Sequence, residues 1–119
     1  MNIGTLHAIG VGVGFAIIFV SGYVLRRTGR PYGSLLLNVH KLLSVALLAF
    51  VIWRVVADAG PVKPVAIAAI SLSMLSLCTL IGTGGALSAM SSPPAIVRRL
   101  HRALPYIAVV LTISWLLLH

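Results

Sequence analysis

The sequence predicts an all-α fold, an integral membrane four-helix antiparallel bundle, and three observations lead to that class. Of the 119 residues, 60% are hydrophobic and only 8% are charged, and the mean hydropathy is +1.11. A soluble domain is nearer half apolar and a quarter charged, so this excess cannot be buried in one small core. The apolar residues also fall in four long runs separated by short segments rich in glycine, proline and charge.

The four runs predict transmembrane helices over residues 3–25, 35–57, 64–81 and 95–118. A helix needs about 20 apolar residues to cross the hydrocarbon core of a bilayer. Residues 26–33 and 58–61 carry the glycine, proline and charge of turns, and residues 82–85 (Gly-Thr-Gly-Gly) are expected to open a longer loop. Short connections make consecutive helices antiparallel neighbours. We therefore expect residues 1–119 to form a single transmembrane domain.

The charge is strongly basic, with nine lysines and arginines against one acid, Asp58, and a net charge of +8. In a soluble protein this balance would point to nucleic acid. Here the cations lie at the ends of apolar runs, which is typical of membrane topology and argues against nucleic-acid binding. Seven of them fall on the side of the first and third loops, and only Arg54 and Lys63 fall on the other. The positive-inside rule predicts cytoplasmic first and third loops and both termini outside.

Two histidines stand near the start of the second and fourth predicted helices, and each is followed by a cation: His40-Lys41 and His101-Arg102. An imidazole inside a membrane span costs free energy unless it has a partner, so it is a candidate functional site. Both lie about one to two turns in from the cytoplasmic end. Two histidines on facing helices can ligate the iron of a b-type haem. We predict that pair as iron ligands, the alternative being two interfacial polar residues at helix ends.

Neighbours of this pair are candidates for further contacts with a haem. Lys41 and Arg102, together with Arg98 or Arg99, could meet the propionates near the membrane interface. Ser44, one turn after His40, could either orient the imidazole ring or hydrogen-bond the helix backbone. The two ligand helices could be adjacent or diagonal in the bundle.

The first and last runs contain weaker candidates. Gly10 and Gly14 share one helix face with His7, and small residues at such spacing let a planar ring or a second helix approach closely. Helix packing is the alternative role for these glycines. His7 and His119 lie at the outer ends of their helices and could ligate a second haem, the alternative being interfacial residues at frayed helix ends.

Several short motifs carry a resemblance to a known family. Gly82-Thr83-Gly84, Pro93-Pro94 and the run Arg98-Arg99-Leu100-His101-Arg102 precede an apolar helix, and His40-Lys41-Leu42-Leu43 begins an earlier one. Together they resemble the small bacterial membrane b-type cytochromes of the cytochrome b561 type. The resemblance implies haem b ligated by His40 and His101, in the inner membrane of a prokaryote. It also implies electron exchange with a quinone or a redox protein partner, alone or as a subunit of a quinone-linked oxidoreductase.

Two other classes of protein fit the same composition. A small four-helix transporter of the multidrug-resistance size would work as a dimer, and proton-coupled export usually needs a carboxylate inside the membrane. The only acid, Asp58, lies at a helix end. A cofactor-free membrane anchor or assembly subunit is the third alternative. Bound haem would separate the first hypothesis from both others.

Overall fold

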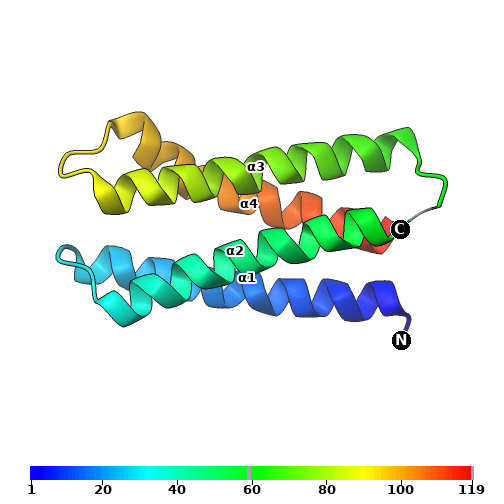
Figure 1. Ribbon diagram of the computed structural model, residues 1–119, viewed down its shortest axis with the longest axis horizontal. Helices are drawn as coiled ribbons and strands as arrows, with labels where there is room; N and C mark the ends of the chain where they lie inside the picture. Colours follow the sequence, from blue (N-terminus) through cyan, green and yellow to red (C-terminus); the bar gives the residue numbers. More distant parts are fainter. Residues whose placement is uncertain (59, 119) are drawn as a thin grey trace.

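The protein is an all-α bundle of four helices, which confirms the predicted fold class (Figure 1). The computed structural model describes residues 1–58 and 60–118. Its helices are α1 (Ile3–Thr28), α2 (Ser34–Ala57), α3 (Pro64–Ala89) and α4 (Ala95–Leu118). The shorter helices have 24 residues, and at 1.5 Å per residue they are about 36 Å long, enough to cross a hydrocarbon core of roughly 30 Å.

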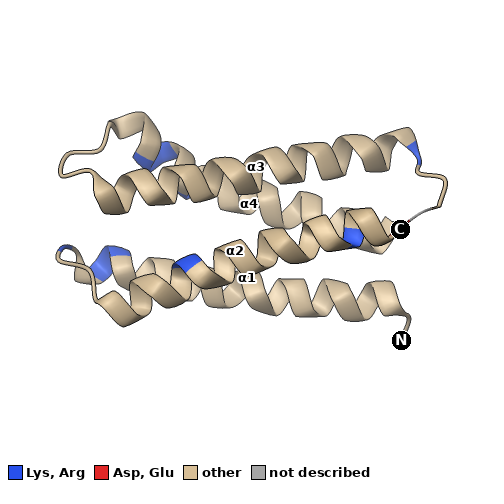
Figure 2. Ribbon diagram, viewed as in Figure 1, with Lys and Arg blue, Asp and Glu red and all other residues tan. Residues whose placement is uncertain are grey.

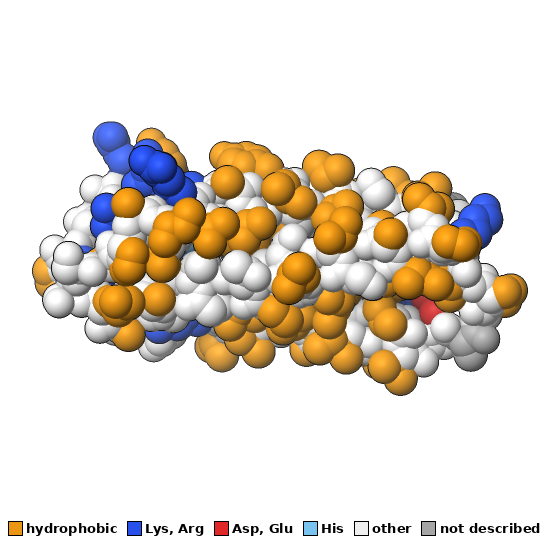
Figure 3. Space-filling model, turned by 90° about the horizontal axis from the view of Figure 1, so that it is seen from above, with side chains coloured by type: hydrophobic (Ala, Val, Ile, Leu, Met, Phe, Trp, Pro, Cys, Tyr) orange, Lys and Arg blue, Asp and Glu red, His pale blue; other side chains and the backbone are white. Residues whose placement is uncertain are grey.

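On the face of the bundle seen in Figure 3, apolar side chains are spread along most of the length. Large hydrophobic side chains on every helix are more than half exposed, among them Val20, Leu42, Leu75 and Val110. Soluble monomers rarely carry continuous apolar patches of more than a few hundred Å². All four helices are long and apolar enough to cross a membrane. The bundle is therefore suited to lipid surroundings, as a multi-pass membrane protein.

The order of helix packing decides which helices face each other across the bundle. The pairs that pack along their lengths are α1–α2, α2–α3, α3–α4 and α1–α4, and the α3–α4 pair is the most extensive. Consequently α1 lies diagonally opposite α3, and α2 lies diagonally opposite α4. The sequence left open whether the two histidine-bearing helices are adjacent or diagonal, and the structure makes them diagonal.

A buried hydroxyl pair within the hydrophobic core joins α3 to α4. Phe15, Val51 and Trp115 are at most 3% exposed and belong to one hydrophobic cluster. Among them, Ser73 Oγ lies 2.5 Å from Thr112 Oγ1, and both residues are fully buried. Thr112 donates its hydroxyl proton to its own helix backbone, 2.7 Å from the Ala108 carbonyl oxygen. Ser73 is therefore the donor in the bond between the helices.

Two helices extend beyond their predicted ends. The prediction that α3 ends at residue 81 is wrong: the helix continues to Ala89, so the Gly-Thr-Gly-Gly segment is helical. Glycine is tolerated in membrane helices, where it allows close packing. The first helix continues through Thr28 because Arg26 and Arg27 suit the negative end of the helix dipole. It ends at Gly29, whose φ of 67° favours glycine.

Most lysines and arginines lie toward the end of the bundle that holds the α1–α2 and α3–α4 loops (Figure 2). Arg30, in the first of these loops, donates hydrogen bonds to the backbone carbonyl of Leu87 in α3 and to that of Ser91, at 3.5 Å, in the second loop. Its guanidinium also lies 5.6 Å from the ring centre of Tyr32. These contacts connect the two helical hairpins at the basic end.

The Ser73–Thr112 bond predicts a measurable coupling between α3 and α4. In a double-mutant cycle of Ser73→Ala and Thr112→Val, we expect an interaction free energy of about 0.5–1.5 kcal/mol, typical of hydrogen bonds between membrane helices. The measurement is the free energy of unfolding in detergent or bicelles. Additive effects of the two substitutions on the free energy of unfolding would contradict a stabilising hydrogen bond between Ser73 and Thr112.

Candidate functional site

His40 and His101 face each other inside the bundle, one from α2 and one from α4. Their ring centroids are 6.4 Å apart and their planes are inclined by 61°. Each is the seventh residue of its helix, counted from Ser34 and from Ala95, so both lie about 9 Å in from the basic end at 1.5 Å per residue. The structure thus brings together the two histidines that the sequence singled out.

Each imidazole is held by a hydroxyl group from the neighbouring helix of its own hairpin. Ser21 Oγ in α1 lies 2.9 Å from His40 Nδ1. Thr83 Oγ1 in α3 lies 3.0 Å from His101 Nδ1. Both hydroxyl residues are at least half-buried, and Ser21 is only 5% exposed. The two rings therefore have matching partners on matching atoms.

The backbone contacts of these hydroxyls favour one tautomer for both rings. Ser21 Oγ donates to the Ile18 carbonyl oxygen at 3.0 Å, and Thr83 Oγ1 donates to the Thr79 carbonyl oxygen at 2.8 Å. A hydroxyl has only one proton, and when that proton is bonded to the carbonyl the oxygen accepts from the ring. Nδ1 then carries the hydrogen in each neutral imidazole. Nε2 is left with the lone pair that a metal requires.

Glycine next to each hydroxyl makes room for the ring. A Cβ atom at Gly22 would lie 3.1 Å from His40 Cε1, and one at Gly84 would lie 3.0 Å from His101 Cε1. Nine in ten real Cβ contacts are longer than this, so the backbones of α1 and α3 lie directly against the two imidazoles. Each Ser-Gly or Thr-Gly pair thus contacts one edge of its histidine ring.

The other predicted neighbours of the pair lie close to it in sequence but not against the rings. Lys41, Arg102 and Arg98 are exposed at the basic end, and Arg98 donates to the Pro93 carbonyl oxygen at 2.7 Å. Ser44 donates to the backbone carbonyl oxygen of His40 at 2.8 Å. Of the two roles considered for Ser44, the structure has the hydrogen bond to the helix backbone.

Gly10 and Gly14, predicted as cofactor contacts, lie away from the histidine pair in this structure. A Cβ at Gly10 would meet nothing within 4 Å, and one at Gly14 would lie 3.9 Å from Leu47. Gly14 therefore serves the packing of α1 on α2, whereas Gly10 faces outward. The glycines that contact the imidazoles are further along the chain.

The two histidines predicted as weaker ligand candidates at the outer end are His7 and His119, and the structure describes only His7. His7 packs edge-on against Phe50 and Trp53 of α2, with ring centroids at 5.5 and 6.2 Å. Phe50 lies ten residues after His40, about 15 Å along the helix at 1.5 Å per residue. The Nδ1 atom of His7 is buried without a hydrogen-bond partner among the described residues. His119 lies outside the described residues.

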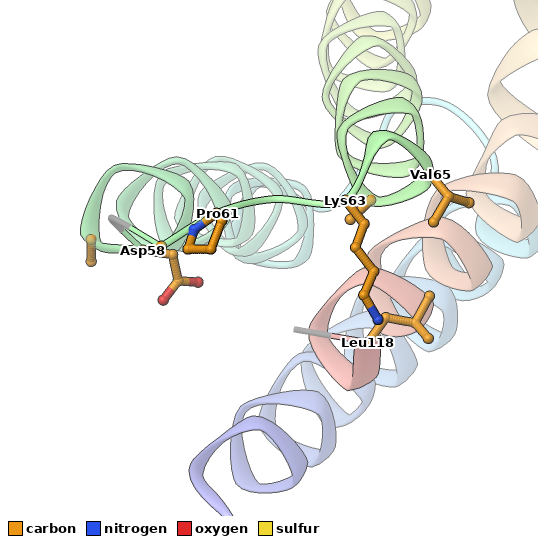
Figure 4. Close-up of a pocket in the computed structure, with 8 residues that line it drawn as sticks. Asp58, Pro61, Lys63, Val65 and Leu118 are labelled. Atoms are coloured by element: carbon orange, nitrogen blue, oxygen red, sulfur yellow. The ribbon is translucent and has the colours of Figure 1, made fainter.

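A cavity of about 480 Å³ lies at the opposite end of the bundle from the histidine pair (Figure 4). The α2–α3 loop and the last residue of α4 line it, including Asp58, Lys63 and Leu118. Asp58 is the acid that the transporter alternative required, and it forms an ion pair with Arg54 at 2.9 Å. An i,i+4 pair of this kind at a helix end serves local stability.

No family model, curated protein or solved structure matches this chain at a significant level. The site must therefore be judged on its own chemistry. Within residues 1–58 and 60–118, no group of three or more histidine, cysteine or acidic residues could hold a metal ion. A pair of imidazoles provides two ligands only, so a metal bound there needs the remaining ligands from another source.

Sequence analysis missed the residues that hold the rings. Ser21 and Gly22 were not singled out, and Thr83 and Gly84 were quoted in the family resemblance but assigned to a loop. The signal that could have found them is an internal repeat, because each hydroxyl–glycine pair precedes a histidine–cation pair by nearly the same distance. The hydroxyl and the histidine it contacts are 19 residues apart in one case and 18 in the other.

The close contacts of Gly22 and Gly84 predict a loss of stability on enlargement. Gly22→Ala and Gly84→Ala should each lower the free energy of unfolding by about 1–3 kcal/mol, since the added methyl must displace a packed ring. Gly82→Ala is the matched control on α3, because a Cβ there meets nothing within 4 Å. Unfolding in detergent measures all three. Equal stability of Gly84→Ala and Gly82→Ala would contradict the packing described for His101.

Proposed function

We propose that this chain is a membrane-embedded b-type haem protein that transfers electrons, in which His40 and His101 would hold one haem iron. The observation that carries the proposal is the pair of imidazoles that face each other from diagonal helices at equal depth. Polar rings in the apolar interior of a membrane bundle are costly, which favours a functional reason for placing two of them together.

The donor set fits an iron porphyrin better than a bare metal ion. The porphyrin itself supplies four nitrogen ligands, so two histidines complete the coordination. A ligating histidine nitrogen lies about 2 Å from its metal, and the ring centroid about 1 Å behind it, so two axial rings have centroids roughly 6 Å apart. The observed separation of 6.4 Å agrees with that value. The tautomer assigned above leaves Nε2 of both rings available for coordination.

The surroundings of the pair suit a bound haem electrostatically. Lys41 and Arg102 directly follow the two histidines and are exposed, and they would interact with the propionates, together with Arg98. Apolar helices on all sides would keep water from the iron. When bound, haem supplies one-electron redox chemistry, whereas the protein supplies ligation, orientation and a medium of low polarity.

The proposed setting follows from the distribution of charge. Basic residues concentrate at the α1–α2 and α3–α4 loops (Figure 2), so under the positive-inside rule these loops face the cytoplasm and both termini face outward. The inner membrane of a prokaryote is the proposed location. With the histidine pair about 9 Å from that end, electron exchange would take place on the cytoplasmic side, with a quinone or with a redox protein.

The proposal predicts a b-type absorption spectrum that depends on both histidines. Protein purified after expression with ample haem should give sharp reduced-minus-oxidised bands and close to one haem per chain. His40→Ala and His101→Ala should each abolish these bands or reduce them more than tenfold, because each removes one of the two axial bonds. Absorption spectroscopy with a haem-to-protein ratio measures both effects.

His7→Ala is the matched control, since it removes a half-buried histidine from the other end of the bundle. One haem per chain in this variant is the expected result. A ratio near two in the parent protein that falls to one in His7→Ala would establish a second haem at the outer end. A colourless parent protein would reject the haem proposal and favour the transporter or the anchor subunit.

A further inference from the structure

The two halves of the bundle repeat each other around the histidine pair. Thr83 follows Ser21 by 62 residues (83 less 21), and Leu80 follows Ile18 by the same offset. Each hydroxyl oxygen lies close to the carbonyl oxygen three residues earlier, at 3.0 Å for Ser21 and 3.1 Å for Thr83. His101 follows His40 by 61 residues, and a cation comes next in both places. Each hairpin therefore contains one hydroxyl–glycine pair and one histidine–cation pair.

The pattern of burial repeats with the same offsets. Three of the five residues buried in α1 recur as buried residues in α3 after 62 residues: Ala8 and Ile70, Val11 and Ser73, Phe15 and Leu77. Residues buried in α2 recur in α4 after 61 residues: Leu47 and Ala108, Val51 and Thr112. Five coincidences in side-chain burial, independent of the histidine contacts, indicate that the two hairpins are equivalent units. Because α1 and α3 run in the same direction, the units are related by an approximate two-fold axis along the bundle.

We infer that Ser21 and Thr83 are equivalent positioning residues, one for each ligand, which fix the tautomer of His40 and His101 and tune the iron bound between them. This inference rests on the proposed haem function. In this arrangement Ser21 Oγ and Thr83 Oγ1 each accept a hydrogen bond from a ring nitrogen and donate one to a backbone carbonyl. Gly22 and Gly84 let the helix that carries the hydroxyl approach the ring closely enough for this contact.

The hydrogen bond at Nδ1 has a defined electronic effect on the metal. An Nδ1–H that donates to an acceptor makes Nε2 a more basic ligand. A more basic ligand stabilises the ferric iron over the ferrous iron, which lowers the reduction potential. Loss of either hydroxyl should therefore raise the potential. It should also weaken haem binding by about 10- to 100-fold, the usual effect of removing such an outer partner.

The first test is a redox titration of the haem-loaded protein with substitutions at the two hydroxyls. Ser21→Ala and Thr83→Val should each raise the reduction potential, and each should weaken haem binding. The exchanges Ser21→Thr and Thr83→Ser keep a hydroxyl at each place and should restore parental values, since the two halves already use either residue. Thr28→Val and Thr79→Val are matched controls, because both hydroxyls bond only backbone carbonyls.

A second test reads the tautomer without haem and separates this inference from the proposed function. In full-length protein expressed without haem and labelled with ¹⁵N-histidine, both rings should show the Nδ1–H form at a pH where they are neutral. Ser21→Ala should change the spectrum of His40 and leave His101 as it was, and Thr83→Val should do the reverse. Nε2–H rings in the parent, or spectra and potentials unmoved by either substitution, would overturn the inference even if the protein binds haem.

Discussion

The structure depends on one constraint, the cost of keeping a polar imidazole inside an apolar membrane bundle. Each of the two interior histidines meets this cost in the same way, through a hydrogen bond between its Nδ1 atom and a hydroxyl group of the neighbouring helix. The hydroxyl in turn donates to a helix carbonyl, so no polar hydrogen in the chain of contacts is left unpaired. The helices must then come close together, which accounts for glycine beside both hydroxyls.

Diagonal packing of α2 and α4 brings the two histidine–hydroxyl pairs together in one site. Because α2 and α4 face each other across the bundle rather than side by side, their side chains at equal depth point toward a shared interior. The flanking helices α1 and α3 supply the hydroxyls and the glycines, so all four helices contribute to the site. A cofactor bound between the rings would therefore report on the assembly of the whole bundle, and its ligand geometry would be fixed by helix packing rather than by loops.

Much of the fold could be predicted from the sequence, because membrane helices are recognised by the length and apolar composition of their sequence runs. The fourth helix was predicted at its observed bounds, whereas the third was ended eight residues early at its glycines. Glycine is common both in turns and in membrane helices that pack closely, so local sequence alone does not distinguish the two structures. His40 and His101 could be singled out because polar rings stand out in apolar runs. Ser21 does not stand out by itself, since a lone serine in a membrane helix commonly bonds its own backbone, and only its repeat in Thr83 marks it.

The central claim is that His40 and His101 ligate one iron from opposite corners of the bundle. The most direct measurement is electron paramagnetic resonance of the oxidised, haem-loaded protein, combined with hyperfine spectroscopy of ¹⁵N-histidine. We expect a low-spin ferric signal with couplings to two histidine nitrogens, and loss of one coupling in His40→Gly or His101→Gly supplied with unlabelled imidazole. A high-spin signal, or a single histidine coupling in the parent protein, would contradict the claim.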